Sequence, residues 1–189
     1  MPQLTDKNDE DLMLLTGKGK KKAFEELVKR HTRPLQNYFY RYFRNIEDSK
    51  DYAQQVFVQI FQSAKRYRRL SKFTTWMYTV ARNIYINEIA RRQKVRFTPL
   101  EFAENKGTRR NMVEDTVAGK DTAYFVRKAL DALPAEFKEV LVLQVYQELK
   151  CAEIAKLLKI PEGTVWSRLH YGLKLFKKEY EKVTGEHEL

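Results

Sequence analysis

The sequence predicts an all-α protein made of two small helical domains joined by a flexible linker, with a helix-turn-helix in the second domain. Apolar residues recur at steps of three and four over most of the chain, and its 189 residues include only seven Gly and five Pro. Both features favour helices over strands. The periodicity fades near the middle of the chain. We therefore expect domains at residues 1–95 and 121–189, separated by a linker at residues 96–120.

The first domain reads as helical almost throughout, from Asp9 to about Arg92. A helix through AFEELVKRHTRPLQNYFYRYF is expected to kink or restart at Pro34. The next helix should take Asp48 or Ser49 as its N-cap. The segment YRRLSK then interrupts the pattern as a short loop. Two buried stripes are expected to form the core, Tyr52, Val56, Ile60 and Ala64 on one helix and Met77, Val80, Ala81 and Ile84 on the next.

Several classes of function find no support in the sequence. No run of about 18 apolar residues exists, so we expect no membrane insertion, and the N-terminus shows no secretory signal. A single cysteine, Cys151, suits a reducing cytoplasm and a buried structural role. Three scattered histidines give no metal-ligand spacing, and no catalytic constellation or phosphate loop can be assembled. We expect neither a cofactor nor enzymatic activity.

The charge of the chain is concentrated. Lys and Arg number 36 against 25 Asp and Glu, a formal net charge of +11. The segment from Lys65 to Arg96 holds ten basic residues and one acidic residue, Glu88, with aromatic rings set among the cations. Such a pattern favours a nucleic-acid partner. A solvated basic face or an anionic membrane surface are the alternatives.

The second domain opens with AYFVRKALDALPAEFKEVLVLQVYQEL. Pro134 is expected to restart the helix at its first turn, where a missing N–H costs nothing. The expected buried residues are Phe125, Ala129, Leu130, Leu133, Phe137, Val140, Leu141 and Val145.

The segment CAEIAKLLKIPEGTVWSRLHYGLKLFKK predicts a helix-turn-helix. Its first helix turns Ile154, Leu157 and Leu158 inward, KIPEG forms the turn, and the second helix buries Val165, Leu169, Leu173 and Phe176. Such a second helix enters the major groove by its N-terminal end. The alternative is an ordinary helical hairpin. The residues expected to face DNA are Thr164, Trp166, Ser167, Arg168, His170, Tyr171 and Lys174.

With both halves in view, the chain resembles the sigma factors of the sigma-70 family, in their two-domain extracytoplasmic-function (ECF) group. DYAQQVF resembles the segment that docks on the clamp helices of RNA polymerase. FTTWMYTVARNIYINEIARR resembles the segment that opens and reads the minus-ten promoter element. EIAKLLKIPEGTVWSRLHYGLKLF resembles the module that reads the minus-thirty-five element.

The resemblance implies roles for particular residues. Asp51, Gln54 and Gln55 would bind polymerase, although Gln55 stands where the family usually has an acidic residue. Asn83 would read the edge of a flipped-out base, because an amide both donates and accepts hydrogen bonds. Core packing is the favoured use of Phe73 and is weighed equally for Trp76. The full set expected at the minus-ten element is Tyr67, Arg68, Arg69, Lys72, Phe73, Trp76, Arg82, Asn83, Arg91 and Arg92.

The partners implied by the resemblance are bacterial core RNA polymerase and promoter DNA, both duplex and single-stranded. An anti-sigma factor is a further expectation from the family. Trp166, Tyr171 and Leu173 stand where many relatives carry Arg, so we expect a different or weaker minus-thirty-five preference. Two other hypotheses stay open at this point. One is a stand-alone helix-turn-helix transcriptional regulator, and the other is an RNA- or single-strand-binding protein.

Overall fold

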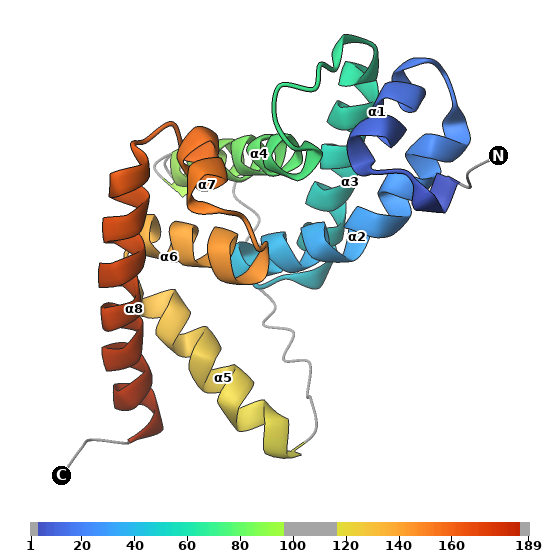
Figure 1. The fold of residues 1–189 in the computed structure, drawn as a ribbon. Helices are drawn as coiled ribbons and strands as arrows, with labels where there is room; N and C mark the ends of the chain where they lie inside the picture. The colour runs from blue at the N-terminus through green and yellow to red at the C-terminus, as the bar shows by residue number, and fades with distance from the viewer. Residues whose placement is uncertain (1–3, 97–116, 186–189) are drawn as a thin grey trace. The chain divides into compact units, whose positions relative to one another are not determined.

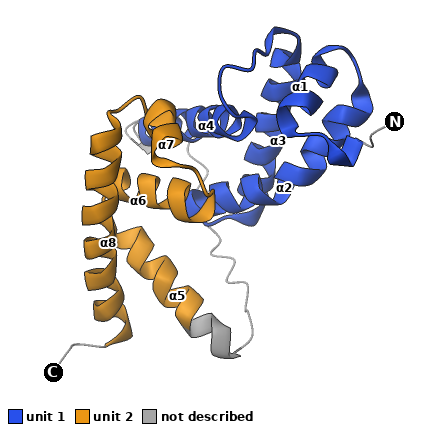
Figure 2. Cartoon of the chain, viewed as in Figure 1, with its two compact units in different colours: residues 1–110 blue, residues 111–189 orange. Residues whose placement is uncertain are grey.

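The computed structural model describes residues 4–96 and 117–185, and every regular element within these ranges is helical. The chain divides into two compact units, residues 1–110 and residues 111–189 (Figure 2). The all-helical, two-domain prediction is confirmed. No helix within the described ranges is both long and apolar enough to span a membrane.

Unit 1 is built from four α-helices and two short 3-10 helices (Figure 1). In chain order these are η1 (Leu4–Asp6), α1 (Asp9–Gly17), α2 (Lys21–Phe43), α3 (Ile46–Ser63), η2 (Ala64–Arg66) and α4 (Phe73–Arg96).

Local signals explain where these helices begin. Asn8 caps α1, because its Oδ1 accepts a hydrogen bond from the backbone N of Asp11 at 2.8 Å. Asn45 caps α3 in the same way, accepting from the N of Asp48 at 3.1 Å. The prediction of Asp48 or Ser49 as this cap is wrong, since the cap lies three or four residues earlier, at Asn45.

Helix α2 runs through Pro34 without a break. Leu27 and Leu35, one on each side of the proline, are both fully buried. Packing on both sides therefore holds the helix together despite the hydrogen bond that proline cannot donate. A restart at Pro34 does not occur.

The core of unit 1 forms where α2, α3 and α4 pack together, with α1 against them. Val56 and Ile60 are buried on α3 and Ala64 at the start of η2, and Met77, Ala81 and Ile84 are buried on α4, as the stripes predict. Tyr52 and Val80 are half-buried at the edges of these stripes.

Unit 2 consists of α5 (Val117–Ala132), α6 (Ala135–Leu141), η3 (Val142–Tyr146), α7 (Cys151–Leu158) and α8 (Glu162–Thr184). Helix α5 begins inside the range expected for the linker, of which residues 97–116 lie outside the described part of the chain. The restart at Pro134 is confirmed, since α5 ends at Ala132 and α6 begins at Ala135.

Two of the expected buried residues in unit 2 are exposed. Val145 is 57% exposed, because it lies in η3, a π-helical turn whose wider spacing changes the face that each residue occupies. Leu173 is 53% exposed, and Gly172 is buried in its place. A Cβ at Gly172 would lie only 3.3 Å from the Cβ of Phe137 on α6, so glycine allows α6 and α8 to approach closely.

Candidate nucleic-acid interface

The loop between η2 and α4, residues 67–72, presents cations to solvent. Arg68, Arg69 and Lys72 are all exposed, and the backbone N of Leu70 donates to the carbonyl of Arg68 at 2.8 Å in a tight turn. Leu70 itself is 85% exposed. Arg69 is held by carboxylate Oδ1 of Asp11 at 2.7 Å. The loop is therefore a compact, basic projection suited to a phosphate backbone.

Three aromatic rings cluster at the base of this loop, that of its first residue, Tyr67, and those of Phe73 and Trp76 on α4. The rings of Tyr67 and Trp76 have centroids 5.2 Å apart, and those of Phe73 and Trp76 are 6.0 Å apart. Tyr67 and Trp76 are half-buried, so part of each ring stays accessible. Burial raises the pKa of the Tyr67 hydroxyl above its ordinary value.

Phe73 is fully buried, with 0% of its surface exposed. Its ring packs against Trp76 and against the imidazole of His31, at a centroid distance of 5.3 Å. Phe73 is therefore removed from the residues expected to contact DNA. Its ring supports the loop from behind, in agreement with the core role that the sequence favoured.

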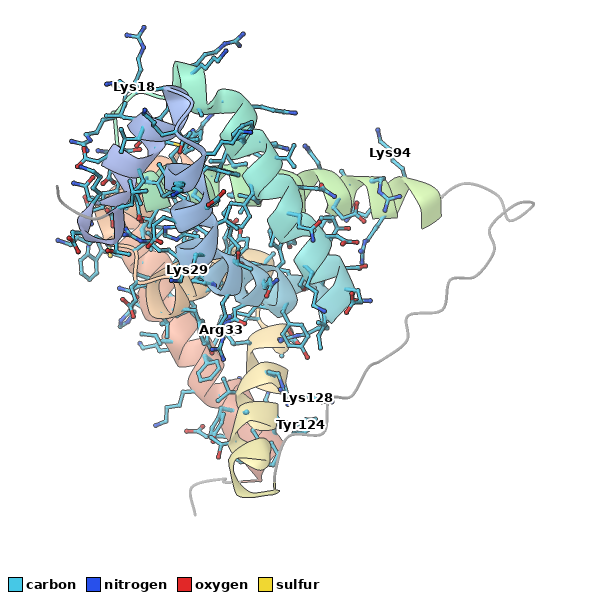
Figure 3. The ribbon with its side chains drawn as sticks, turned by 90° about the vertical axis from the view of Figure 1, so that its right-hand side faces the viewer. Lys18, Lys29, Arg33, Lys94, Tyr124 and Lys128 are labelled. Carbon is cyan, nitrogen blue, oxygen red and sulfur yellow. The ribbon has the colours of Figure 1, made fainter. Side chains whose placement is uncertain are left out.

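Helix α4 extends the same surface. Asn83 is exposed and lies seven residues after Trp76, which places the two on one face of the helix, about 10 Å apart along its axis. Arg82 is half-buried beside Asn83. Lys94 projects from the last turns of α4 (Figure 3).

Arg91 and Arg92 are bound to other residues of unit 1. Glu88, only 8% exposed, accepts hydrogen bonds from Arg91 at 2.8 Å and from Arg92 at 2.6 Å. Arg92 also donates to Asp48 Oδ2 on α3 at 2.7 Å and to the Tyr52 hydroxyl at 3.3 Å. The hydrogen bonds from Arg91, then those from Arg92, lower the pKa of Glu88 to about 2.

Arg91 and Arg92 differ in how far each guanidinium group is available to DNA. The side chain of Arg91 is 67% exposed and can still face a phosphate. Arg92 is tied to α3 and lies over the ring of Phe43, with its guanidinium carbon 4.7 Å from the ring centroid. Arg92 therefore joins α3 to α4, which the sequence did not anticipate.

Cations alone do not define this interface. Lys29 and Arg33, one turn apart on α2, are also exposed (Figure 3). Loop 67–72 and α4 differ from them by combining cations with accessible rings and an amide. We call this combination the ring-and-cation face: loop 67–72 together with Trp76 and Asn83.

A second exposed surface lies on α3. Asp51, Gln54 and Gln55 are all exposed on this helix, as the sequence predicts. The surface continues into Val58 and Phe61, which are 54% and 51% exposed. These two apolar residues were missed in the sequence, although their positions four and seven residues after Gln54 put them on the same side of the helix. We call these five residues the α3 face.

In unit 2 the helix-turn-helix is formed by α7 and α8, joined across residues 159–161. Val165 and Leu169 are buried against the rest of the unit. Lys159 ends α7 in a left-handed conformation, with φ of 57°. The steep turn that follows leaves the first turns of α8 open to a ligand.

Most of the residues expected to face DNA on α8 are exposed: Trp166, Ser167, His170, Tyr171 and Lys174. Thr164 is half-buried, and its carbonyl accepts from the hydroxyl of Ser167 at 3.0 Å. Arg168 is half-buried and pairs with Glu136 on α6 at 3.2 Å. Glu136 therefore competes with a phosphate or a base for one Nη group of Arg168.

Models of known protein families match a segment of each unit. The family model of Sigma-70 region 2 matches residues 27–95, which include loop 67–72, most of α4 and the α3 face. The model of Sigma-70, region 4 matches residues 126–176, which include the helix-turn-helix. The chain belongs to the sigma-70 family of RNA polymerase sigma factors.

The relatives place the chain in the ECF group. It is 28% identical over 170 residues to the ECF RNA polymerase sigma factor SigW of Bacillus subtilis (strain 168), covering 86% of this chain and 91% of that protein. It is 30% identical over 167 residues to the RNA polymerase sigma factor YlaC of the same organism, covering 87% of this chain and 95% of YlaC.

A solved structure shares the fold. The sigma factor RpoE from Bartonella quintana, in complex with the anti-sigma factor NepR, superposes with a TM-score of 0.65 at 16% identity, covering 88% of this chain and 99% of that one. The family resemblance inferred from the sequence is confirmed. The protein is a non-enzymatic subunit that directs promoter recognition by RNA polymerase, and the region 2 match leaves the stand-alone regulator without support.

Proposed function

We propose that this sigma factor assembles with bacterial core RNA polymerase through the α3 face, opens promoter DNA with the ring-and-cation face, and holds the upstream duplex with α8. The observation that carries the proposal is the make-up of the ring-and-cation face. Exposed cations, two accessible rings and the Asn83 amide lie together in the unit that matches region 2.

Opening a promoter requires the capture of bases as they leave the duplex. Unstacking and unpairing a base costs a few kcal/mol. Stacking on an aromatic ring returns about 1–3 kcal/mol per base, and cations hold the backbone. Tyr67 and Trp76 would supply the stacking, with Arg68, Arg69, Lys72, Arg82 and Arg91 near the phosphates. Asn83 would read the edge of a captured base with its amide.

The α3 face suits a protein partner. Asp51, Gln54 and Gln55 offer polar contacts that can be satisfied by a helical partner of mixed charge. Val58 and Phe61 add apolar area, which drives association when it is buried. A surface of this make-up fits the clamp helices better than it fits DNA, because it carries no cation.

Helix α8 would anchor the upstream element. Arg168 and Lys174 would contact phosphates or guanine edges, and Ser167 and His170 would donate to base edges. Trp166 and Tyr171 offer apolar contact to thymine methyl groups, so the preferred sequence should be richer in A·T pairs than an Arg-reading helix would select.

The protein would act where RNA polymerase acts, in the cytoplasm. An anti-sigma factor is a further proposed partner, since the RpoE structure with the shared fold is a complex with an anti-sigma factor.

The test is assembly and opening with purified core RNA polymerase. Asp51→Ala combined with Gln54→Ala should weaken core binding, whereas Asn83→Ala should leave core binding intact and slow promoter opening about tenfold, since a base-edge contact is worth about 1–3 kcal/mol. Unchanged opening and base preference in Asn83→Ala would remove the assigned role of Asn83. Full activity of both variants would refute the residue assignments while leaving the family unaffected.

A further inference from the structure

Helix α1 contacts loop 67–72 and the helical elements on both sides of it, η2 and α4. Before the loop, Gly17 of α1 comes so close to η2 that an added Cβ would lie 2.5 Å from the carbonyl oxygen of Ala64. In the middle, Arg69 donates to Asp11 Oδ1 at 2.7 Å and to Asn8 Oδ1 at 3.1 Å. Figure 1 shows α1 within unit 1, where it packs against η2, α3 and α4.

The third contact starts α4. Carboxylate Oε1 of Glu10 accepts a hydrogen bond from the backbone N of Phe73 at 2.7 Å. Phe73 is the first residue of α4, and the first N–H groups of a helix have no partner within it. Glu10 therefore caps α4 from 63 residues away in the sequence, and its negative charge faces the positive end of the helix dipole.

A different carboxylate holds α1 itself. Asp9 pairs with Arg30 on α2 at 2.9 Å and with Nε2 of His31 at 2.7 Å. Although burial opposes its ionisation, the hydrogen bonds from His31 and Arg30 keep the pKa of Asp9 below its ordinary value. The consecutive acids of α1 thus divide their contacts: Asp9 binds α2, while Glu10 and Asp11 bind the loop and the start of α4.

Such contacts matter for base capture because ordering a backbone residue costs about 1–2 kcal/mol. The loop carries three exposed cations, which repel one another and disfavour a single compact shape. If α1 holds the loop in advance, DNA binding does not bear that ordering cost.

We propose that Glu10 and Asp11 are positioning residues for promoter opening, which hold loop 67–72 in the shape that receives a base. The inference rests on the proposed function of the ring-and-cation face and adds α1 to it. Neither carboxylate contacts DNA. Glu10 acts through the backbone of Phe73, and Asp11 acts through the guanidinium of Arg69.

The test compares Glu10→Ala with Glu10→Gln in the full-length protein. Alanine removes the hydrogen-bond acceptor, whereas the amide oxygen of glutamine can accept the same hydrogen bond from the backbone N of Phe73. Holoenzyme with Glu10→Ala should open a duplex promoter about tenfold more slowly, the effect of losing a charge-assisted hydrogen bond. Glu10→Gln should restore most of the rate, and core affinity should not change in either variant. Asp11→Ala and Arg69→Ala should be non-additive in a double-mutant cycle.

Two controls separate positioning from stability. Ile60→Val trims a fully buried side chain of α3 and lowers the stability of unit 1 without touching the loop. It should leave opening unchanged. The second control needs no DNA: in a Trp166→Phe background, acrylamide quenching of Trp76 should increase in Glu10→Ala and stay at the parent level in Glu10→Gln, because Trp76 lies against the loop residue Tyr67.

The proposal is overturned if Glu10→Ala opens promoters at the parent's rate and acrylamide quenches its Trp76 no more than in the parent. It is also overturned if Ile60→Val slows opening as much as Glu10→Ala does. Failure of the parent holoenzyme to open its promoter would instead count against the proposed function. The quenching comparison would then still decide whether α1 orders the loop.

Discussion

Replacing Glu88 by Gln should destabilise unit 1, and the size of the effect can be worked out from the structure. The substitution keeps the shape of the side chain and removes its charge. Glu88 is almost completely buried and accepts two hydrogen bonds from Arg91 and one from Arg92. Without its charge, two guanidinium groups lie side by side on α4 with Asp48 as their remaining acidic neighbour among the described contacts.

The magnitude follows from the pKa of Glu88, which hydrogen bonds from Arg91 and Arg92 lower from 4.5 to about 2. A shift of one unit corresponds to about 1.4 kcal/mol. Arg91 is 67% exposed, so water screens its part of the interaction. We therefore expect Glu88→Gln to lower the free energy of unfolding by about 1–3 kcal/mol at pH 7.

The sign of the pH dependence also follows. A carboxyl group with a lowered pKa in the folded state stabilises the protein fully above its unfolded pKa, and this contribution is lost as the pH falls through the folded pKa. The difference in the free energy of unfolding between wild type and Glu88→Gln should therefore reach its full size above about pH 5 and shrink to roughly half or less near pH 3.

Urea unfolding followed by Trp76 fluorescence, in a Trp166→Phe background, reports on unit 1 alone. The matched control is Glu47→Gln, which breaks an exposed pair with Lys50 at 2.9 Å and should change stability by less than about 0.5 kcal/mol. Superimposable curves for Glu88→Gln and its parent at pH 7 would refute the role of this network, as would a difference that stays constant down to pH 3.

Two further predictions concern unit 2. Gly172→Val should lower the melting temperature of unit 2 in calorimetry, because the valine side chain would be forced against Phe137. Overpacking of this kind costs about 1–3 kcal/mol. An unchanged melting temperature would show that α6 can shift to accommodate the larger side chain. Lys174→Ala should weaken holoenzyme binding to duplex promoters of any upstream sequence and reduce the slope of log affinity against log salt by about one. Loss of binding to one upstream sequence only would instead identify Lys174 as a base-reading residue.

The sequence predicted the parts of the fold that depend on local pattern. Steps of three and four located the buried faces of α3 and α4, and Pro134 located the start of α6. The exposed Asp51, Gln54 and Gln55 follow from the same periodicity. The predicted cap of α3 was wrong because several neighbouring residues can act as a helix cap. Asn45, Asp48 and Ser49 are all good capping residues, and only the backbone path shows that Asn45 is used.

Other features depend on contacts between distant parts of the chain. Leu173 is a natural core residue by type, but the close approach of α6 selects Gly172 for the interface. Arg92 was predicted to contact a phosphate, and the fold places the carboxylate of Asp48 beside it. The contact between Glu10 and Phe73 spans 63 residues. No spacing rule relates these pairs, so they could not be found from the sequence.

The most direct test of the account is the state of the promoter strands in the assembled holoenzyme. Core RNA polymerase with this sigma factor should make unpaired thymines in the minus-ten region reactive to permanganate, and core enzyme alone should not. Asn83→Ala holoenzyme should bind the same promoter with reduced reactivity. A wild-type holoenzyme that occupies its promoter and leaves those thymines unreactive would contradict the claim that the rings and cations of loop 67–72 and α4 trap separated strands.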